Sequence, residues 1–260
     1  MELTKENYLK LRDKKEHTRP QLASIFGIPD WKLKKWIASN NLGVKRPTLG
    51  KPRAFREETP EASYWAGFIA ADGCVDDKGR VRFYLQLSDS THLEKFARFV
   101  GSTHKLNLDS NRNRCSLEFT CKAMVEDLLR WNITPRKSIT YTPPENLRYT
   151  ADFLRGVVDG DGTISESFSN KDSLTATLYA GVVCSYSFRD WFVPFCETEL
   201  GITVKQHERE NCVNITMNTN KSKIFLSYLY RDSKPEVRLD RKYKLYDLIV
   251  VQDIRKTRVL

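Results

Sequence analysis

One short pattern occurs twice in this chain, and the repeat limits how the chain can fold. GFIAADG spans residues 67–73 and GVVDGDG spans residues 156–162, and each ends in a small residue, an aspartate and a glycine. Each copy follows a start signal for a helix, because Thr59 precedes Pro60 and Thr150 stands at the matching place as a hydroxyl cap. Both segments are therefore predicted to be helices that end at an aspartate.

The two predicted helices share a pattern of small residues four apart on one face. These are Gly67 and Ala71 in the first helix, and Gly156 and Gly160 in the second. Small residues at this spacing leave a notch that lets two helix backbones approach closely. We therefore expect the two helices to pair and to bring their C-terminal ends together.

Asp72 and Asp161 would then lie side by side at the two helix ends. A helix C-terminus carries partial negative charge, so a carboxylate there is unfavourable by a few tenths to about 1 kcal/mol. Two such carboxylates repel each other unless a cation lies between them, and oxygen ligands favour Mg²⁺ or a similar hard ion. An ordinary Asp-Gly turn explains either copy alone, but the repetition at equivalent positions favours a paired site.

The residues after each copy follow one order of predicted elements. In each half a helix precedes two strands, a second helix, two more strands and a closing helix. The predicted fold class is therefore α+β, with two pseudo-symmetric αββαββα halves at residues 59–142 and 143–260.

The charge of the chain is positive and uneven. The net charge is +10, and residues 1–58 hold 14 Lys and Arg against 7 Asp and Glu. A basic segment beside a nearly balanced body favours a polyanionic partner, most often nucleic acid, although a basic soluble surface gives the same balance. No apolar run of about 18 residues predicts a membrane span. Six cysteines without a CxxC pair favour reduced thiols in a cytoplasmic protein that has no structural zinc site.

Residues 1–45 are predicted to form a small all-α domain. PQLASIF and WKLKKWIASNNLG have the pattern of two helices joined by a turn at Gly27, with Asp30 as N-cap and Gly43 as the stop. This arrangement is typical of a helix-turn-helix that binds DNA, and the alternative is a helical cap with solubilising lysines. The residues predicted to contact DNA here are Trp31, Lys32, Lys34, Lys35, Lys45 and Arg46. Residues 46–58, rich in Pro, Gly and Arg, are predicted to be a basic linker.

The two copies, WAGFIAADG and LRGVVDGDG, resemble the signature of the LAGLIDADG homing endonucleases. TPRKS after the first half and DRKY after the second also resemble the pattern of that family. The resemblance covers roughly residues 59–250 and implies that the two sheets form a DNA-binding saddle. Two positions depart from it, since Ala70 and Asp159 differ at the sixth motif position and Arg155 replaces an alanine. Neither departure removes an aspartate of the predicted metal pair.

By this resemblance, Asp72 and Asp161 bind catalytic Mg²⁺, or another divalent cation such as Mn²⁺, with help from the main-chain oxygens of Ala71 and Gly160. The implied reaction is metal-assisted hydrolysis of both strands of double-stranded DNA at a long, non-palindromic site. The implied enzyme acts as a monomer and needs no protein partner.

The resemblance also implies one catalytic lysine in each half. Lys137 and Lys242 would stabilise charge on the phosphate that is cut. Arg136 and Arg241 compete for this role, and ordinary surface lysines are the alternative for both positions. Two weaker candidates, which would hold a water network, are Asp89 and Ser185.

The polar faces of the two sheets would read the DNA bases, unless they are simply solvated. In the first half the predicted contacts are Arg82, Tyr84, Gln86, Ser88, Lys105, Asn107, Arg114, Ser116 and Lys122. In the second half they are Thr175, Thr177, Tyr179, Lys205, His207, Arg209, Asn214, Thr216 and Asn218. Because the two sets differ at nearly every position, we predict a non-palindromic target.

A different class of function is also open. A catalytically inactive nucleic-acid-binding protein, such as an intron maturase or a transcriptional regulator, could keep the same fold. The presence of both Asp72 and Asp161 favours the enzyme. An intein lacks support, because the chain ends in KTRVL without the His-Asn junction of protein splicing.

Overall fold

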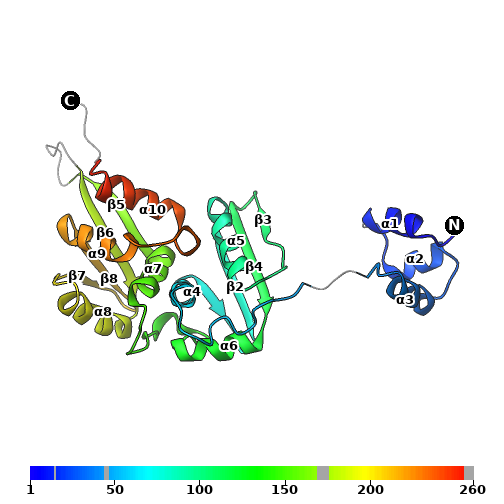
Figure 1. The fold of residues 1–260 in the computed structure, drawn as a ribbon, viewed down its shortest axis with the longest axis horizontal. Coiled ribbons are helices and arrows are strands. Elements are labelled where there is room, and N and C mark those ends of the chain that lie inside the picture. The colour runs from blue at the N-terminus through cyan, green and yellow to red at the C-terminus, as the bar shows by residue number, and fades with distance from the viewer. Residues whose placement is uncertain (15, 44–46, 169–175, 255–260) are drawn as a thin grey trace. The chain divides into compact units, whose positions relative to one another are not determined.

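The computed structural model describes residues 1–14, 16–43, 47–168 and 176–254. The chain divides into two compact units, Met1–Pro47 and Thr48–Leu260 (Figure 1). In the described residues no helix is long and apolar enough to cross a membrane.

The described residues of the first unit form three helices around a small apolar core. The helices are α1 (Lys5–Asp13), α2 (Arg19–Ile25) and α3 (Asp30–Ser39). The side chains that form this core are Tyr8, Leu22, Ala23, Phe26, Leu33 and Ile37. The sequence pattern did not predict α1, whose N-cap is Thr4.

Two details of α3 differ from prediction. Asp30 is the first helical residue rather than the N-cap, and its carboxylate binds Arg19 at 2.7 Å. The helix ends at Ser39, before Gly43, because Asn41 adopts a left-handed backbone conformation with φ of 54°. Asparagine tolerates this conformation well, so it can end a helix where glycine was expected.

The second unit contains two halves with the same order of elements, as predicted. The first half contains α4 (Pro60–Ala71), β1 (Gly73–Val75), β2 (Arg80–Gln86), η1 (Leu87–Asp89), α5 (Ser90–Phe99), β3 (Asn107–Asp109), β4 (Arg114–Thr120), α6 (Lys122–Leu128), η2 (Leu129–Trp131) and η3 (Lys137–Ile139). The second contains α7 (Thr150–Asp161), β5 (Gly162–Ser167), β6 (Thr177–Cys184), α8 (Tyr186–Thr198), β7 (Lys205–Glu208), β8 (Val213–Asn218), α9 (Asn220–Tyr230), η4 (Pro235–Val237), α10 (Asp240–Tyr246) and η5 (Asp247–Val251).

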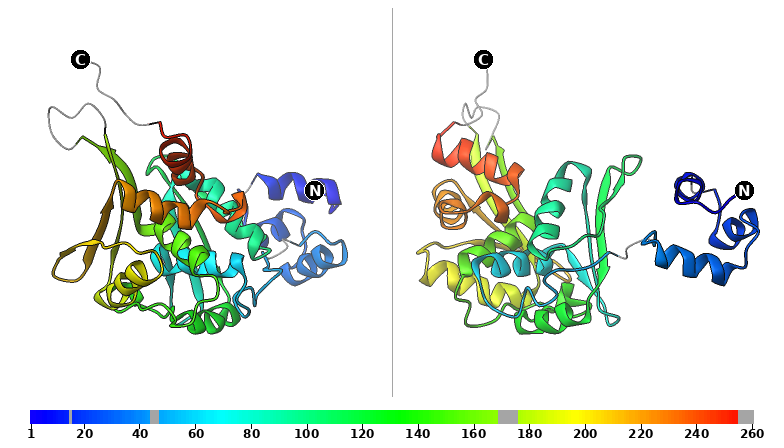
Figure 2. Two further views of the ribbon diagram at one scale, coloured as in Figure 1. Left: turned by 60° about the vertical axis from the view of Figure 1, so that its left-hand side comes forward. Right: turned by 45° about the vertical axis from the view of Figure 1, so that its right-hand side comes forward.

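Each half folds its four strands into one antiparallel sheet. The strand order is β1-β2-β4-β3 in the first half and β5-β6-β8-β7 in the second. Apolar and polar residues alternate along β2, so Val81, Phe83 and Leu85 face the core. Figures 1 and 2 show the two sheets on opposite sides of the helix pair α4 and α7. The predicted α+β fold with two pseudo-symmetric halves is confirmed.

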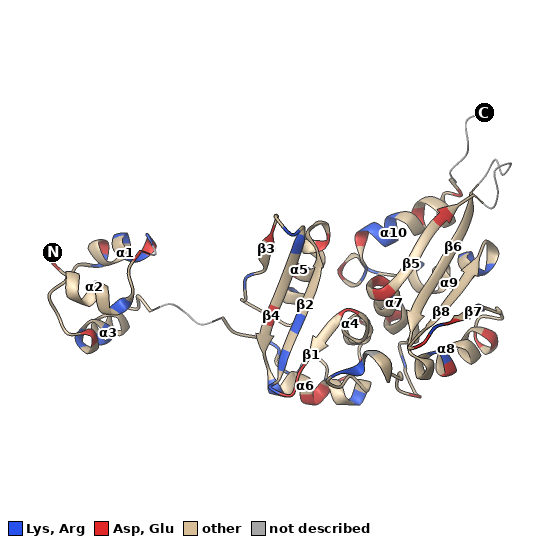
Figure 3. Cartoon of the chain, turned by 180° about the vertical axis from the view of Figure 1, so that it is seen from behind, with Lys and Arg blue, Asp and Glu red and all other residues tan. Residues whose placement is uncertain are grey.

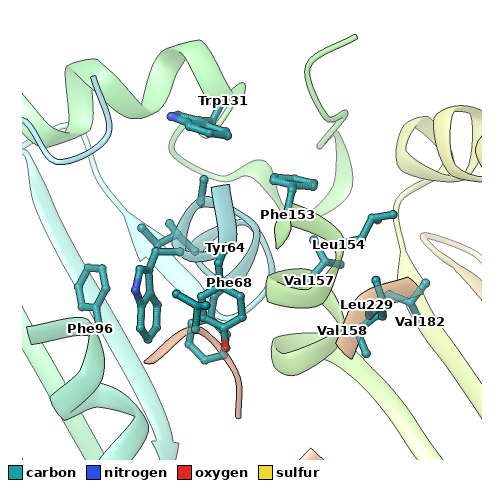
Figure 4. Close-up of a cluster of buried hydrophobic side chains, with 14 of the residues drawn as sticks. Tyr64, Phe68, Phe96, Trp131, Phe153, Leu154, Val157, Val158, Val182 and Leu229 are labelled. Atoms are coloured by element: carbon teal, nitrogen blue, oxygen red, sulfur yellow. The ribbon is translucent and has the colours of Figure 1, made fainter. Parts of the chain in front are cut away.

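Helices α4 and α7 touch backbone to backbone through the predicted notches. A Cβ added to Gly67 would lie 2.0 Å from the main-chain oxygen of Phe153, and one added to Gly156 would lie 2.0 Å from that of Tyr64. No larger residue fits at either position without moving a helix. Figure 4 shows the buried side chains that surround this contact, with Tyr64 and Phe68 beside Phe153 and Val157.

The two helices begin differently. The Thr59 hydroxyl accepts a hydrogen bond from the Ala62 amide at 3.1 Å, as expected of a cap. Thr150, however, lies inside α7, where Tyr149 is the N-cap, and its hydroxyl donates to the main-chain oxygen of Leu147 at 2.9 Å. The predicted hydroxyl cap of the second helix was therefore wrong.

Residues 48–58, predicted to belong to a linker, pack against the first half. Phe55 is fully buried, and the Trp131 indole donates to its main-chain oxygen at 3.1 Å. Arg53 binds Asp127 at 2.8 Å. This apolar anchor makes most of the predicted linker part of the folded unit, because burying an aromatic side chain offsets the cost of ordering a short segment.

Candidate active site and nucleic-acid interface

Asp72 and Asp161 lie at the adjacent C-terminal ends of the two central helices. Asp72 caps α4, and Asp161 is the last residue of α7. A Cβ added to Gly160 would lie 2.5 Å from the Cβ of Ala71 and 3.6 Å from that of Asp72. The close packing of the helix ends therefore brings the two aspartates together, as the repeat predicts.

Crowding by protein atoms disfavours the charged form of both carboxyl groups. It raises the pKa of Asp72 to about 6, and the negative charge of Asp161 contributes to this shift. The pKa of Asp161 is also raised, chiefly by desolvation. Both aspartates are still exposed to solvent, so an ion from solution can reach them. A bound cation would offset the repulsion between the two carboxylates.

The donor set fits a hard divalent ion that takes few protein ligands. The described residues contain no group of three or more His, Cys, Asp or Glu side chains that could hold a metal ion. The two carboxylates would therefore depend on main-chain oxygens and water for the remaining ligands, an arrangement that suits Mg²⁺. The end of α4 leaves carbonyl oxygens without a helical partner near Asp72. The Gly160 oxygen receives a long contact of 3.4 Å from Lys242 Nζ.

Lys137 and Lys242 occupy equivalent places beside the two aspartates. Lys137 Nζ donates to the main-chain oxygen of Gly73 at 2.7 Å, and Lys242 Nζ donates to that of Gly162 at 2.6 Å. Each lysine thus binds the last glycine of the motif in its own half. Burial lowers the pKa of both lysines, that of Lys242 to about 8. Their positive charges in turn favour the ionised form of Asp161.

The arginines next to these lysines are placed differently. Arg136 is exposed, with a left-handed backbone conformation at φ of 62°. Arg241 instead binds the buried carboxylate of Asp89 at 3.0 Å, across the boundary between the halves. The structure therefore gives Asp89 an ion-pair partner that the sequence did not suggest. Ser185 caps α8, accepting from the Phe188 amide and donating to the Tyr141 oxygen at 2.6 Å.

The outer faces of the sheets carry most of the predicted DNA contacts. Strand register aligns them in rows, since Tyr84 pairs with Ser116 and Ser116 with Asn107. The described residues that share the outer face of the first sheet include Arg82, Tyr84, Gln86, Asn107, Arg114 and Ser116. Those that share the outer face of the second include Thr177, Tyr179, Lys205, His207, Asn214, Thr216 and Asn218.

Four predicted contacts lie outside the strands to which they were assigned. Ser88 follows the end of β2 in the turn η1, and Lys105 precedes β3. Lys122 begins α6 beside Gly79, and Arg209 follows the end of β7. In each case alternation ran past a strand end, which periodicity alone does not mark. Three further predicted contacts, Lys45, Arg46 and Thr175, lie outside the described residues.

The predicted contacts in the first unit share one helix. Trp31, Lys32, Lys34 and Lys35 are all exposed on α3, and Trp31 has 66% of its surface exposed. On the other side of the same helix, Leu33 and Ile37 are buried in the core. Helix α3 is thus amphipathic, with its basic and aromatic side available to a partner.

The sequence alone did not reveal the structural role of the two charged residues that depart from the motif, Asp159 and Arg155. Asp159 is fully enclosed and accepts hydrogen bonds from Tyr64 at 2.7 Å, from Tyr230 at 2.5 Å and from the Leu239 amide at 2.7 Å. Arg155 donates to the main-chain oxygens of Leu229 and Val237 at 2.8 and 2.7 Å. The signal was present, because Arg155 and Asp159 lie among the apolar residues of α7, where a buried charged side chain needs a partner.

Comparison with known proteins agrees with this architecture. No family model matches the chain, and no curated protein matches it. Solved structures do match it, among them the LAGLIDADG meganuclease I-AabMI bound to uncleaved DNA and the meganuclease I-SmaMI bound to uncleavable DNA with a TTCT central four. Both are 14% identical and cover 75% of this chain, with 90% and 92% of their own chains covered and TM-scores of 0.52 and 0.53. With two motif copies, paired motif helices and two matching sheets, this chain has the fold of the LAGLIDADG homing endonucleases.

Proposed function

We propose that this protein is a site-specific DNA endonuclease that makes a metal-dependent double-strand break at a long, non-palindromic site. The observation that carries the proposal is the placement of Asp72 and Asp161 at two packed helix ends, each with a lysine beside it. The stability of the fold does not explain this arrangement, because helix dipoles and desolvation both disfavour carboxylates at these helix ends.

The four residues would divide the chemistry between them. Asp72 and Asp161, with the main-chain oxygens of Ala71 and Gly160, would hold Mg²⁺ or Mn²⁺, which supplies positive charge to polarise the phosphate and activate water. Lys137 would hold a phosphate oxygen, and the positive charges of Lys137 and Lys242 would stabilise the negative charge as the bond breaks. Lys242 would act through its charge alone, because its three donors already bind the main-chain oxygens of Val158, Asp159 and Gly162. An ammonium group has three donor hydrogens, so Lys137 retains donors for a phosphate while it binds Gly73.

The first unit would extend the DNA-binding surface as a helix-turn-helix. Its support is the exposed basic face of α3, which carries Lys32, Lys34 and Lys35. Replacing these three lysines by alanine should weaken DNA binding and flatten its dependence on salt, by roughly 0.9 in the logarithmic slope for each phosphate that is no longer neutralised. The matched control replaces Lys5 and Lys10 of α1 and Lys14 directly after it, which are all exposed, and so removes the same charge. Equal slopes for both triple variants would reject a specific role for α3.

Cleavage of a randomised target library with Mg²⁺ tests the proposal. The unmodified protein should enrich cut sites of one sequence, while Asp72→Asn and Asp161→Asn should bind that sequence without cutting it. Asp77→Asn, an exposed carboxylate in the turn between β1 and β2, is the matched control and should cut normally. Binding without cleavage by the unmodified protein would identify a non-enzymatic DNA binder instead.

A further inference from the structure

The two halves have equivalent strand positions that can be compared residue by residue. Gly73 pairs with Phe83 in the first sheet, and Gly162 pairs with Val182 in the second. Phe83 and Val182 are therefore equivalent, and the neighbouring positions along β2 and β6 follow in register.

Equivalent positions on the outer faces of the central strands have different chemistry. Arg82 corresponds to Gly181, and Tyr84 corresponds to Val183. Glu118, which pairs with Arg82, corresponds to Thr216, which pairs with Gly181. Figure 3 shows the same contrast, because β2 carries basic residues whereas β6 and β8 carry no charged residue.

The first-half face is suited to G·C base pairs. An arginine donates to the acceptors of guanine, and a carboxylate accepts from the amino group of cytosine. Arg82 and Glu118 lie directly opposite each other on neighbouring strands. A carboxylate on a DNA-facing surface repels phosphates, so Glu118 is better explained by contact with a base edge.

Arg114 extends this surface on the neighbouring strand β4. Its guanidinium lies over the ring of Tyr84, 5.0 Å from the ring centre. The interaction orders a long side chain before DNA binds, which lowers the entropic cost of binding. The outer face of the first sheet therefore carries two arginines, Arg82 and Arg114, of which Arg82 donates to the Cys74 sulfur of β1 at 3.6 Å.

The second-half face is suited to A·T base pairs. Asn214 and Asn218 offer amides that match adenine. Val183 leaves 43% of its surface exposed on this polar face, and an apolar side chain there can contact a thymine methyl group. Gly181 admits no larger residue, because a Cβ would lie 2.6 Å from the main-chain oxygen of Ile215. An arginine equivalent to Arg82 therefore cannot occur at this place.

We propose that the target has one half-site with G·C pairs opposite Arg82, Glu118 and Arg114, and one with A·T pairs opposite Asn214, Asn218 and Val183. The inference rests on the proposed function, since it assigns base preferences to the same DNA-binding faces. It concerns the central strands only. Lys205, counted among the base contacts in the sequence analysis, lies on the fully exposed edge strand β7, and we assign it here to a phosphate.

Selection of bound sites from a fully randomised library tests this inference independently of cleavage. The full chain carrying Asp72→Asn is used, so that binding is measured without cutting. One half-site should be enriched in G·C pairs and the other in A·T pairs. Arg82→Ala should lower the preference for guanine at one position of the G·C half-site by roughly tenfold or more. Arg82→Gln should shift the preference at that position toward adenine.

Variants of the second sheet provide the opposite prediction and the control. Asn214→Ala and Val183→Ala should relax A·T positions in the other half-site only. Lys205→Ala should weaken binding to all sequences without changing preference. Glu118→Gln, a milder change than Arg82→Ala, should reduce the preference for cytosine. It tests the first sheet even if the arginine variant misfolds.

The outcomes separate this inference from the proposed function. Half-sites of equal composition, or relaxation of an A·T position by Arg82→Ala, would overturn the inference while leaving a sequence-specific binder. No enriched sequence at all would overturn both.

Discussion

Lys242 donates from Nζ to the main-chain oxygen of Gly162 at 2.6 Å, the same interaction that Lys137 makes with Gly73 at 2.7 Å in the other half. Each hydrogen bond fixes a positive charge directly beside the end of a motif helix. Lys242 also donates to the main-chain oxygens of Val158 and Asp159, at 2.5 and 3.0 Å. The second lysine is thus held by more of its helix than the first.

Removing the positive charge of Lys242 should impair DNA cleavage more than DNA binding. Lys242→Met should lower the cleavage rate at least tenfold, because a fixed cation beside a phosphate stabilises charge as the bond breaks. The measurement is a single-turnover cleavage assay combined with a binding assay on the selected target. Lys244→Met, on the exposed side of α10, is the matched control and should behave like the unmodified protein. Unchanged cleavage by Lys242→Met would show that this lysine acts only in the structure.

The rate should also depend on pH through Lys242. Burial lowers the pKa of Lys242 to about 8, so the ammonium form is complete well below that pH and disappears above it. Cleavage should therefore fall as the pH rises through about 8. Lys242→Arg should abolish this decline if the variant is active, since a guanidinium stays protonated throughout. A decline that persists in the arginine variant would assign the titration to another group.

Asp72 should destabilise the protein in the absence of metal. Its pKa rises to about 6 on folding, so between about pH 4 and 6 the folded protein binds more protons than the unfolded chain. Stability without metal should therefore fall as the pH rises through this window. Asp72→Asn should raise the free energy of unfolding at pH 7.5 by up to about 1 kcal/mol, a value discounted because the carboxylate is open to solvent.

Mg²⁺ should stabilise the unmodified protein more than it stabilises Asp72→Asn. It should raise the melting temperature of the unmodified protein in proportion to the logarithm of its concentration above the dissociation constant. The Asp72→Asn variant should gain little, because one of two carboxylate ligands is missing. Thermal melts with EDTA and with increasing Mg²⁺ measure both effects. Equal gains for the two proteins would place the ion elsewhere.

The packed helix pair should tolerate no added methyl group. Gly67→Ala and Gly156→Ala should each lower the free energy of unfolding by about 3 kcal/mol or more, because the new Cβ meets a main-chain oxygen that cannot move alone. This cost exceeds the gain of about 1 kcal/mol from better helix propensity. Gly43→Ala, with open space around its Cβ, is the control and should change little. Urea denaturation measures all three variants.

The hydroxyl of Tyr64 should contribute to stability through Asp159. Tyr64→Phe removes one donor to this enclosed carboxylate and should lower the free energy of unfolding by about 1 to 3 kcal/mol. Tyr84→Phe, on the outer face of the sheet, removes an exposed hydroxyl and should have almost no effect. Equal stability of the two variants would show that Tyr230 and the Leu239 amide satisfy Asp159 without help.

The features predicted correctly from the sequence are those that repeat. The motif helices, their notches and the αββαββα order depend on periodicity and small residues, which two copies reinforce. The convergence of Asp72 and Asp161 followed from the same pairing. These features are local or symmetric, so each copy could be used to check the other.

The features that the sequence did not predict depend on interactions between distant segments or on a choice of partner. Thr150 looked like a cap, but the hydroxyl binds the Leu147 oxygen, and no local pattern reveals that choice. Phe55 anchors a segment whose composition indicated a linker. The ion pair of Asp89 with Arg241 joins residues 152 positions apart, so only the folded chain shows it.

The hydrogen bonds of Asp159 also determine which half can associate with which. Tyr64 corresponds to Phe153 and Asp159 to Ala70, so two copies of the second half would bury carboxylates with no tyrosine from the facing helix. Two copies of the first half would bury tyrosine hydroxyls opposite alanine, and each hydroxyl would keep only its contact with His92 Nε2, at 3.0 Å. Fragments produced by a break between Asn132 and Leu147 would therefore reassemble as a heterodimer rather than as two homodimers. The hydrogen bond from Tyr64 to Asp159 would in this way favour pairing of the two halves with each other over pairing of either half with its own copy.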